Sequence, residues 1–178
     1  MTNIVGNDIL AIIHHRSSIR DFTGEAVPEE TLLEIVKAGM AAPSANNFQP
    51  WRFIIVTDKQ MMLRISEKLP YAKMLNKAGG AIIVCGSPDT NNPELSDYWI
   101  QDCAAASQNI LLAVEAFGLG AVWTGVYPRN DRIKWVKDVL DMPADVVPLN
   151  VIPIGYPAKP ALVKDKFKEE KIHWNGWG

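Results

Sequence analysis

Apolar positions repeat along this chain with helical spacing in some segments and with strand-like runs in others. A first helix is expected over residues 7–14, with Asn7 as its cap. A second is expected between Pro28 and Pro43, because proline suits the first turn of a helix and cannot continue one. Its expected apolar face consists of Leu32, Leu33, Val36 and Met40.

Runs of β-branched and aromatic residues predict the strands. They cover residues 51–57, 81–85, 121–126 and 149–154. Between them, helices are predicted over residues 58–69, capped by Asp58, over 98–117, and from Asn130 or Asp131 to residue 140. Because helices and strands alternate, we expect a sheet covered by helices on both faces.

The segment 98–117 predicts the longest helix, packed at the centre of the fold. Gln101, Gln108 and Glu115 recur every seven positions, with Asp102 and Asn109 beside them. This spacing leaves one narrow polar stripe on a helix that is otherwise apolar almost all round. The same residues make the stretch too polar to span a membrane.

The C-terminal segment combines a charged, proline-containing stretch with a hydrophobic end. Residues 158–171 are mostly polar, yet Ile172, Trp174 and Trp177 follow. Because two exposed indoles stabilise nothing, we expect another surface to bury them. The alternation at residues 172–174 predicts an edge strand, which docks on its own sheet or on that of a second copy. The second option predicts a dimer with exchanged tails.

Composition limits the class of protein. The 178 residues fit one domain, residues 1–178, and the net charge of −2 argues against nucleic acid as the main partner. Cys85 and Cys103 both lie among apolar residues, which predicts buried free thiols and a cytoplasmic location. We expect no membrane association.

A basic cluster at residues 16–20 is the first candidate binding motif. Arg16, Ser17, Ser18 and Arg20 offer two guanidiniums and two hydroxyls, which suit a doubly charged phosphate. The cluster follows the C-terminal end of a predicted helix, so side chains must supply the positive charge. The alternative is a solvated helix end whose arginines pair with Asp21 or Glu25.

The second motif, residues 42–51, is named here the amide loop. Its Ser44, Asn47 and Gln49 can hydrogen-bond the polar edge of a flat heterocycle. The alternative is ordinary turn chemistry, but Gln49 precedes Pro50 and is therefore expected to be extended. A phosphate site and a heterocycle site together indicate a phosphorylated cofactor, which we predict to be a flavin.

Other chemistries lack their motifs. His14, His15 and His173 show no metal-ligand spacing, and no nucleophile elbow or Walker loop occurs. Gly118 and Gly120 do not form a dinucleotide fingerprint, and Gly118 is expected to cap the preceding helix. Gly125, beside Thr124 at a strand end, lets the backbone approach a flat ring closely.

Taken together, these segments resemble the FMN-dependent nitroreductase family over nearly the whole chain. The similarity rests on Arg-Ser-Ser-Ile-Arg-Asp-Phe at residues 16–22, on the Pro-Ser…Asn…Gln-Pro-Trp loop at 43–51, and on the helix before Gly-Leu-Gly at 118–120. The resemblance implies an α+β, three-layer α/β/α fold with a mainly antiparallel sheet. It also implies an intertwined homodimer with FMN sites at the subunit interface.

The resemblance implies a set of FMN-binding residues. Phosphate and pyrimidine contacts are expected from Arg16, Ser17, Ser18 and Arg20, and tail contacts to the phosphate from Lys164 and Lys166. The other subunit is expected to supply Pro43, Ser44, Ala45 and Asn47, supported by Gln49. Thr124 and Gly125 are expected against the ring near N5, and Lys73 is a further candidate.

The implied activity is a ping-pong transfer of hydride from NAD(P)H through FMN to an electron-poor acceptor such as a nitroaromatic or a quinone. No side chain is assigned acid or base chemistry, because the cofactor carries the reaction. The alternatives are a flavin-binding sensing or storage protein, a structural domain without cofactor, and a branch that dehalogenates iodotyrosine or degrades flavin. That last branch relies on lid segments for which the loop at residues 87–97 is short.

Overall fold

A five-stranded sheet forms the centre of the computed structural model, which describes residues 5–88 and 97–177. Its strands are β1 (Trp51–Val56), β2 (Gly80–Gly86), β5 (Val147–Gly155) and β3 (Gly120–Ala121), in that spatial order, and β4 (Thr124–Gly125) also pairs with β5. Every pairing between these strands is antiparallel. The predicted antiparallel sheet is therefore confirmed.

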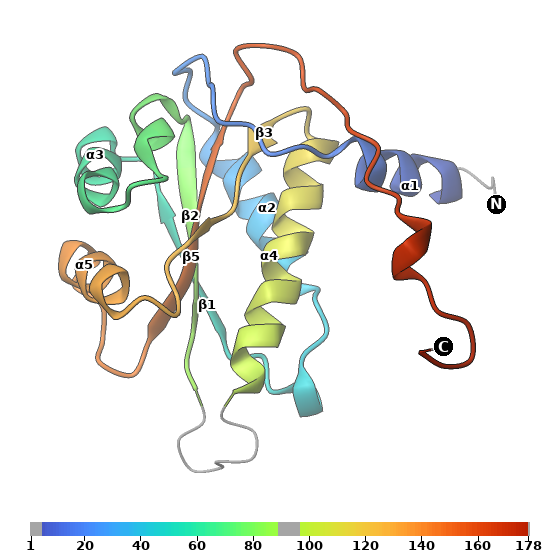
Figure 1. Cartoon of the computed structure of the whole chain (residues 1–178). Helices are drawn as coiled ribbons and strands as arrows, with labels where there is room; N and C mark the ends of the chain where they lie inside the picture. Colours follow the sequence, from blue (N-terminus) through green and yellow to red (C-terminus); the bar gives the residue numbers. More distant parts are fainter. Residues whose placement is uncertain (1–4, 89–96, 178) are drawn as a thin grey trace.

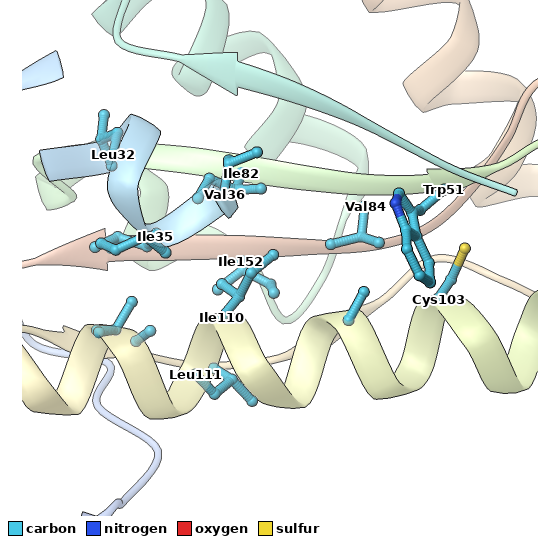
Figure 2. Close-up of a cluster of buried hydrophobic side chains, with 14 of the residues drawn as sticks. Leu32, Ile35, Val36, Trp51, Ile82, Val84, Cys103, Ile110, Leu111 and Ile152 are labelled. Carbon is cyan, nitrogen blue, oxygen red and sulfur yellow. The ribbon is translucent and has the colours of Figure 1, made fainter. Parts of the chain in front are cut away.

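Helices cover both faces of the sheet (Figure 1). Helices α2 (Glu29–Met40) and α4 (Tyr98–Ala116) pack on one face, and α3 (Lys59–Lys68) and α5 (Asn130–Leu140) on the other. Two apolar cores result, one on each side of the strands. Figure 2 shows the first, with Ile35 of α2, Ile82 of β2 and Ile110 of α4 among its buried side chains. The predicted three-layer arrangement is confirmed.

The predicted apolar face of α2 is partly wrong. Leu32 and Val36 are buried, but Leu33 and Met40 are about half exposed, at 49% and 51%. The buried stripe comprises Leu32, Ile35, Val36 and Gly39. These positions follow the i, i+3, i+4, i+7 spacing of one helix face, whereas Leu33 lies one residue, or about 100°, away from it.

Several other boundaries differ from expectation. Helix α1 (Val5–His15) begins before Asn7, so Asn7 is not its cap. The predicted strand 121–126 is interrupted at Val122 and Trp123, which leaves the two short strands β3 and β4. Arg129, rather than Asn130 or Asp131, occupies the N-cap of α5 and makes no side-chain cap bond. Asp58 does cap α3, by accepting from the Met61 backbone N–H.

Helix α4 ends as the sequence predicts. Phe117 is the last residue before the chain turns, and Gly118 has a φ of 69°. The N–H groups of Gly118 and Leu119 donate to the Glu115 and Val114 carbonyls, which is the Schellman arrangement. Because glycine lacks a Cβ, it adopts this left-handed conformation without steric cost.

Helix α1 and the segment after β5 lie outside the three layers (Figure 1). After β5 the tail crosses to the side of α1 and contains one short 3₁₀ turn, η3 (Glu169–Lys171). The predicted edge strand at residues 172–174 is absent from this described segment, and docking on the chain's own sheet is wrong. Trp174 and Trp177 are 85% and 86% exposed, although the His173 ring stacks on Trp177.

Two remaining expectations concern membrane-spanning helices and the loop at residues 87–97. Among residues 5–88 and 97–177, no helix combines the length and apolar character that crossing a membrane requires. Most of the loop at residues 87–97 lies outside the described residues.

Candidate functional site

The basic cluster lies where α1 ends and the chain reaches the sheet. Helix α1 ends at His15, so the positive charge at this position comes from side chains, as predicted. The Ile19 N–H donates to the Ala121 carbonyl of β3 at 2.9 Å, which fixes the cluster against the edge of the sheet. Gly120 makes this contact possible, because a Cβ there would lie 2.8 Å from Ile19 Cβ.

The C-terminal tail returns to the same place. The Lys166 Nζ donates to the Arg16 carbonyl at 3.2 Å, and the Ser17 hydroxyl lies 3.3 Å from the Leu162 carbonyl. Residues 150 positions apart in sequence are thus joined by hydrogen bonds. Lys166 thus lies beside the basic cluster, and its predicted phosphate contact, like that of Lys164, stays a prediction.

These segments enclose a pocket of about 470 Å³, named here the basic pocket. Its lining includes Arg16, Ser17, Ser18, Arg20, Lys159, Lys164 and Lys166, with Asp21 as the one carboxylate. Six of the predicted site residues thus meet in one concavity. Lys159 was not predicted: it sits in a proline-flanked tail segment, and only the fold reveals that this segment returns to residues 16–20.

The charge of the basic pocket fits a phosphate. Among the residues that the structure describes, none of its five cationic side chains forms an ion pair. The alternative in which Arg16 or Arg20 pairs with Asp21 or Glu25 is therefore wrong. Five cations beside one carboxylate repel one another, and a dianion relieves that repulsion. Guanidinium, ammonium and hydroxyl donors are the groups that bind phosphate oxygens.

A second contact holds the end of α1. His15 Nδ1 meets the Glu115 carboxylate near the C-terminal end of α4. The Glu115 side chain is 15% exposed, so this contact is partly shielded from water. Glu115 thereby orients the helix end from which Arg16 follows, and it does not form an acid–base pair with Asp102.

The amide loop lies at the other end of α4 (Figure 1). Its 3₁₀ turn η1 (Ala45–Asn47) contacts α4 at Asp102, whose Oδ1 accepts from the Ala45 N–H at 3.0 Å. Asp102 and Glu115 are 13 residues apart on one straight helix, or about 20 Å at 1.5 Å per residue. Within one copy, the amide loop and the basic pocket are therefore well separated.

The backbone of the amide loop is strained. Asn46, Asn47 and Gln49 have φ values of 49°, 56° and 50°. Gln49 is therefore in the left-handed region, and the expectation that Pro50 makes it extended is wrong. The reason is local bonding: the Gln49 N–H donates to Ser44 Oγ at 3.0 Å, and its side-chain amide donates to Asn47 Oδ1 at 2.9 Å. Both bonds wrap the chain back on itself.

Thr124 and Gly125 form β4 beside β5, and they differ in their exposure to solvent. Thr124 is buried and its hydroxyl donates to the Val151 carbonyl, so this side chain is already bonded within the protein. Gly125 is exposed, and a Cβ placed there would meet no atom within 4 Å. The backbone at Gly125 is thus open to a flat group on the side where a Cβ would stand, while its carbonyl accepts from the Arg132 guanidinium at 3.0 Å.

Lys73 stands apart from both regions. It begins the 3₁₀ turn η2 (Lys73–Lys77), which contacts α3, and it does not line the basic pocket. Asp102 was missed as a site residue, because its spacing placed it in a polar stripe. It is in fact 6% exposed and bonded to the amide loop.

Comparison with known proteins gives the family. Residues 13–78 and 63–156 match the description "Nitroreductase family". The chain belongs to the nitroreductase family. The family resemblance inferred from the sequence motifs is confirmed.

Individual relatives cover nearly the full chain. A protein of Methanothermobacter thermautotrophicus, provisionally named NADH dehydrogenase/NAD(P)H nitroreductase, is 44% identical over 96% of this chain and 88% of its own length. A crystal structure from Parabacteroides distasonis with the same provisional name has a TM-score of 0.90 and 46% identity, covering 97% of this chain and 100% of that one.

A further structure bears on the cofactor. An FMN-dependent nitroreductase from Clostridium difficile has a TM-score of 0.85 and 27% identity. The alignment covers 94% of this chain and 99% of that chain.

Proposed function

We propose that this nitroreductase-family enzyme is an FMN-containing oxidoreductase that takes reducing equivalents from NAD(P)H. The observation that carries the proposal is the basic pocket, where five cations without ion pairs meet two serine hydroxyls. The names of the relatives add support, since they include NAD(P)H nitroreductases and an FMN-dependent nitroreductase.

Arg16, Arg20, Lys159, Lys164 and Lys166 are proposed to hold the FMN phosphate, with Ser17 and Ser18 as hydroxyl donors. The donor set is matched to a dianion, because fixed guanidinium forks and mobile ammonium groups approach it from different segments. Ser17 also lies within hydrogen-bonding distance of the tail at Leu162, so the same residue keeps the pocket closed on that side.

The ring is proposed to lie against the open backbone at Gly125 and to meet the amide loop of a second copy. Pro43, Ser44, Ala45, Asn47 and Gln49 belong to this loop, about 20 Å along α4 from the basic pocket of their own copy. A homodimer brings the two regions together. Of the remaining predicted residues, Thr124 contributes backbone only, and Lys73 has no role in this arrangement.

Exposed apolar surface supports the homodimer. Ile9, Leu10 and Ile13 of α1 are between 41% and 53% exposed. A groove of about 360 Å³ between α1, α2 and α4 is lined almost wholly by apolar side chains, including Leu112 and Ala116. The tail adds Trp174 and Trp177. Apolar surface of this extent is typical of subunit interfaces, and we propose that the tails are exchanged.

When bound, FMN would supply the redox chemistry of a ping-pong transfer of hydride from NAD(P)H to an electron-poor acceptor. The protein's own contribution is electrostatic. Backbone N–H groups and cations aimed at the pyrimidine edge stabilise negative charge that develops there. No protein side chain is assigned a proton transfer.

Anaerobic stopped-flow reduction tests this function. Protein reconstituted with FMN is mixed with NADH or NADPH, flavin absorbance is followed, and a panel of quinones and nitroaromatics then reoxidises it. We expect rapid bleaching by at least one nicotinamide and rapid return of colour with an acceptor. A protein that binds no FMN contradicts the proposal, and slow reduction by both nicotinamides supports the storage alternative.

A further inference from the structure

The amide loop combines a strained backbone with hydrogen bonds that are mostly internal, so its position needs a restraint from outside the loop. Three of the four residues Asn46, Asn47, Phe48 and Gln49 have a positive φ, and none of them is glycine. Such conformations are unfavourable and persist only where surrounding structure determines them. Phe48 is 52% exposed, so burial of this side chain does not supply the restraint.

Most hydrogen bonds of the loop are internal. The Ser44–Gln49 and Asn47–Gln49 contacts, and the backbone bond from Phe48 to Ala45, all join residues of the loop to one another. These bonds fix the shape of the loop, but they move with it. Outside contacts hold the two ends of the loop, where the Ala42 N–H donates to the Gly39 carbonyl and the Ser87 N–H donates to the Pro50 carbonyl. Residues 43–49 between these ends need a separate link to the helices and the sheet.

Asp102 supplies that link. Within the described part of the chain, it is the one side chain outside residues 43–49 that hydrogen-bonds to them, through Oδ1 and the Ala45 N–H at 3.0 Å. Asp102 is 6% exposed and belongs to α4, which packs beside α2 on one face of the sheet. A charged acceptor in a shielded position makes a stronger bond than a neutral one.

We propose that Asp102 is a positioning residue for cofactor binding: its carboxylate holds the strained amide loop so that Ser44 and Asn47 face the flavin of the partner copy. This inference rests on the proposed function. It also explains why a buried position of α4 carries a carboxylate, since a buried charge is costly unless it is bonded.

The first test compares FMN binding by four purified variants. D102A removes the acceptor and is expected to raise the FMN dissociation constant about tenfold or more, measured by quenching of flavin fluorescence. D102N keeps a side-chain oxygen that can accept from Ala45 and is expected to restore binding to within about threefold of wild type. D102E displaces the carboxylate by one methylene and is expected to weaken FMN binding. It keeps the test valid if D102A folds poorly.

Ser107→Ala is the matched control. Ser107 is a fully buried residue of the same helix, and its hydroxyl donates to the Cys103 carbonyl and accepts from Asn150. The variant is expected to lower the unfolding temperature and leave the FMN dissociation constant unchanged. If S107A weakens FMN binding as much as D102A does, Asp102 acts only through stability and the proposal is wrong.

A second measurement does not depend on flavin. Hydrogen–deuterium exchange of the flavin-free protein is expected to show faster exchange at the Ala45 amide and over residues 43–50 in D102A, and near wild-type exchange in D102N. Unchanged exchange in D102A overturns the positioning role. Absence of FMN binding by the wild type, together with faster exchange in D102A, instead contradicts only the proposed function.

Discussion

Single residues of the basic pocket have distinct tasks that their chemistry explains. Arg16 and Lys166 are joined through the Arg16 carbonyl, so the lysine both carries charge and ties the tail to the cluster. Arg20 has no carboxylate partner among the described residues, and its side chain is exposed. Its guanidinium is thus available to an incoming phosphate without breaking an existing ion pair.

Replacing Arg20 tests this assignment. Arg20→Ala is expected to raise the FMN dissociation constant between about tenfold and a hundredfold, because hydrogen bonds to charged groups contribute about 1.5–3 kcal/mol. Arg20→Lys is expected to give a dissociation constant between those of the wild type and R20A, because lysine keeps the charge but lacks the forked donors of the guanidinium. Arg64→Ala, an exposed arginine on α3, is the control. Equal affinity in R20A and wild type, measured by fluorescence titration, removes Arg20 from the phosphate site.

The two cysteines provide a prediction about reactivity. Burial raises the pKa of Cys85 to about 12 and that of Cys103 to about 12, from an ordinary value of 9.0. A thiol reacts as its thiolate, and these groups stay protonated until pH approaches the raised pKa. At mildly alkaline pH we expect Ellman's reagent to label neither thiol in the folded protein and both in concentrated guanidinium chloride. Rapid labelling of the native protein contradicts their burial.

At the scale of elements, α4 links the two halves of the site. It packs on the sheet through Cys103, Ile110 and Val114, contacts the amide loop near its start and meets α1 near its end. The spacing between the two regions is therefore set by the length of one helix. A change in the packing of α4 should reach both regions together.

Core packing of α4 is tested by truncating one buried side chain. Ile110 is fully buried, and Ile110→Ala is expected to lower the free energy of unfolding by about 2–5 kcal/mol, because the cavity it leaves does not close fully. Leu63→Ala on α3, where the side chain is 42% exposed, is expected to change it by less than about 1 kcal/mol. Urea unfolding of the flavin-free proteins measures both, and equal losses contradict this packing.

Elements with a strong local signal were predictable from the sequence. Periodic apolar residues and clear end signals, such as Asp58 and Gly118, located α3 and the end of α4 correctly. Where a tertiary contact decides, local reasoning failed. Residues 121–126 are rich in strand-forming types, yet β3 and β4 pair with β5 through only two residues each.

The same distinction applies to the candidate site. The residue types at 16–20 indicated a phosphate site because their chemistry is local. Lys159 and Asp102 could not be found this way, since one depends on the return of the tail and the other on the contact between the amide loop and α4. The left-handed Gln49 likewise reflects a hydrogen bond to Ser44 that outweighs the preference imposed by Pro50.

At the scale of the whole molecule, the two parts of the proposed site lie far apart within one copy. Each copy carries one basic pocket and one amide loop, which lie at opposite ends of α4. It also exposes apolar side chains on α1 and along the tail. In the proposed two-fold dimer, the loop of each copy would meet the pocket of the other, because such an interface is reciprocal. The burial of apolar surface and the completion of both sites would then be one event.

The tail offers the sharpest test of the dimer. Trp174 and Trp177 are the most exposed indoles, and buried tryptophans often contribute 2 kcal/mol or more to an interface. The double variant W174A/W177A is expected to raise the dimer dissociation constant at least about thirtyfold, measured by sedimentation velocity over a concentration series. FMN affinity should fall with it, although Lys164 and Lys166 remain in place.

The control for the tail is Leu63→Ala, an apolar side chain on α3 that is 42% exposed. It is expected to leave both dissociation constants unchanged, because α3 packs on the face of the sheet opposite α2 and α4. If the wild type sediments as a monomer while it holds FMN tightly, one copy completes the site alone and the homodimer is wrong. If the tail variant stays dimeric but loses FMN, the indoles act on the cofactor site and the apolar groove beside α1 alone holds the subunits together.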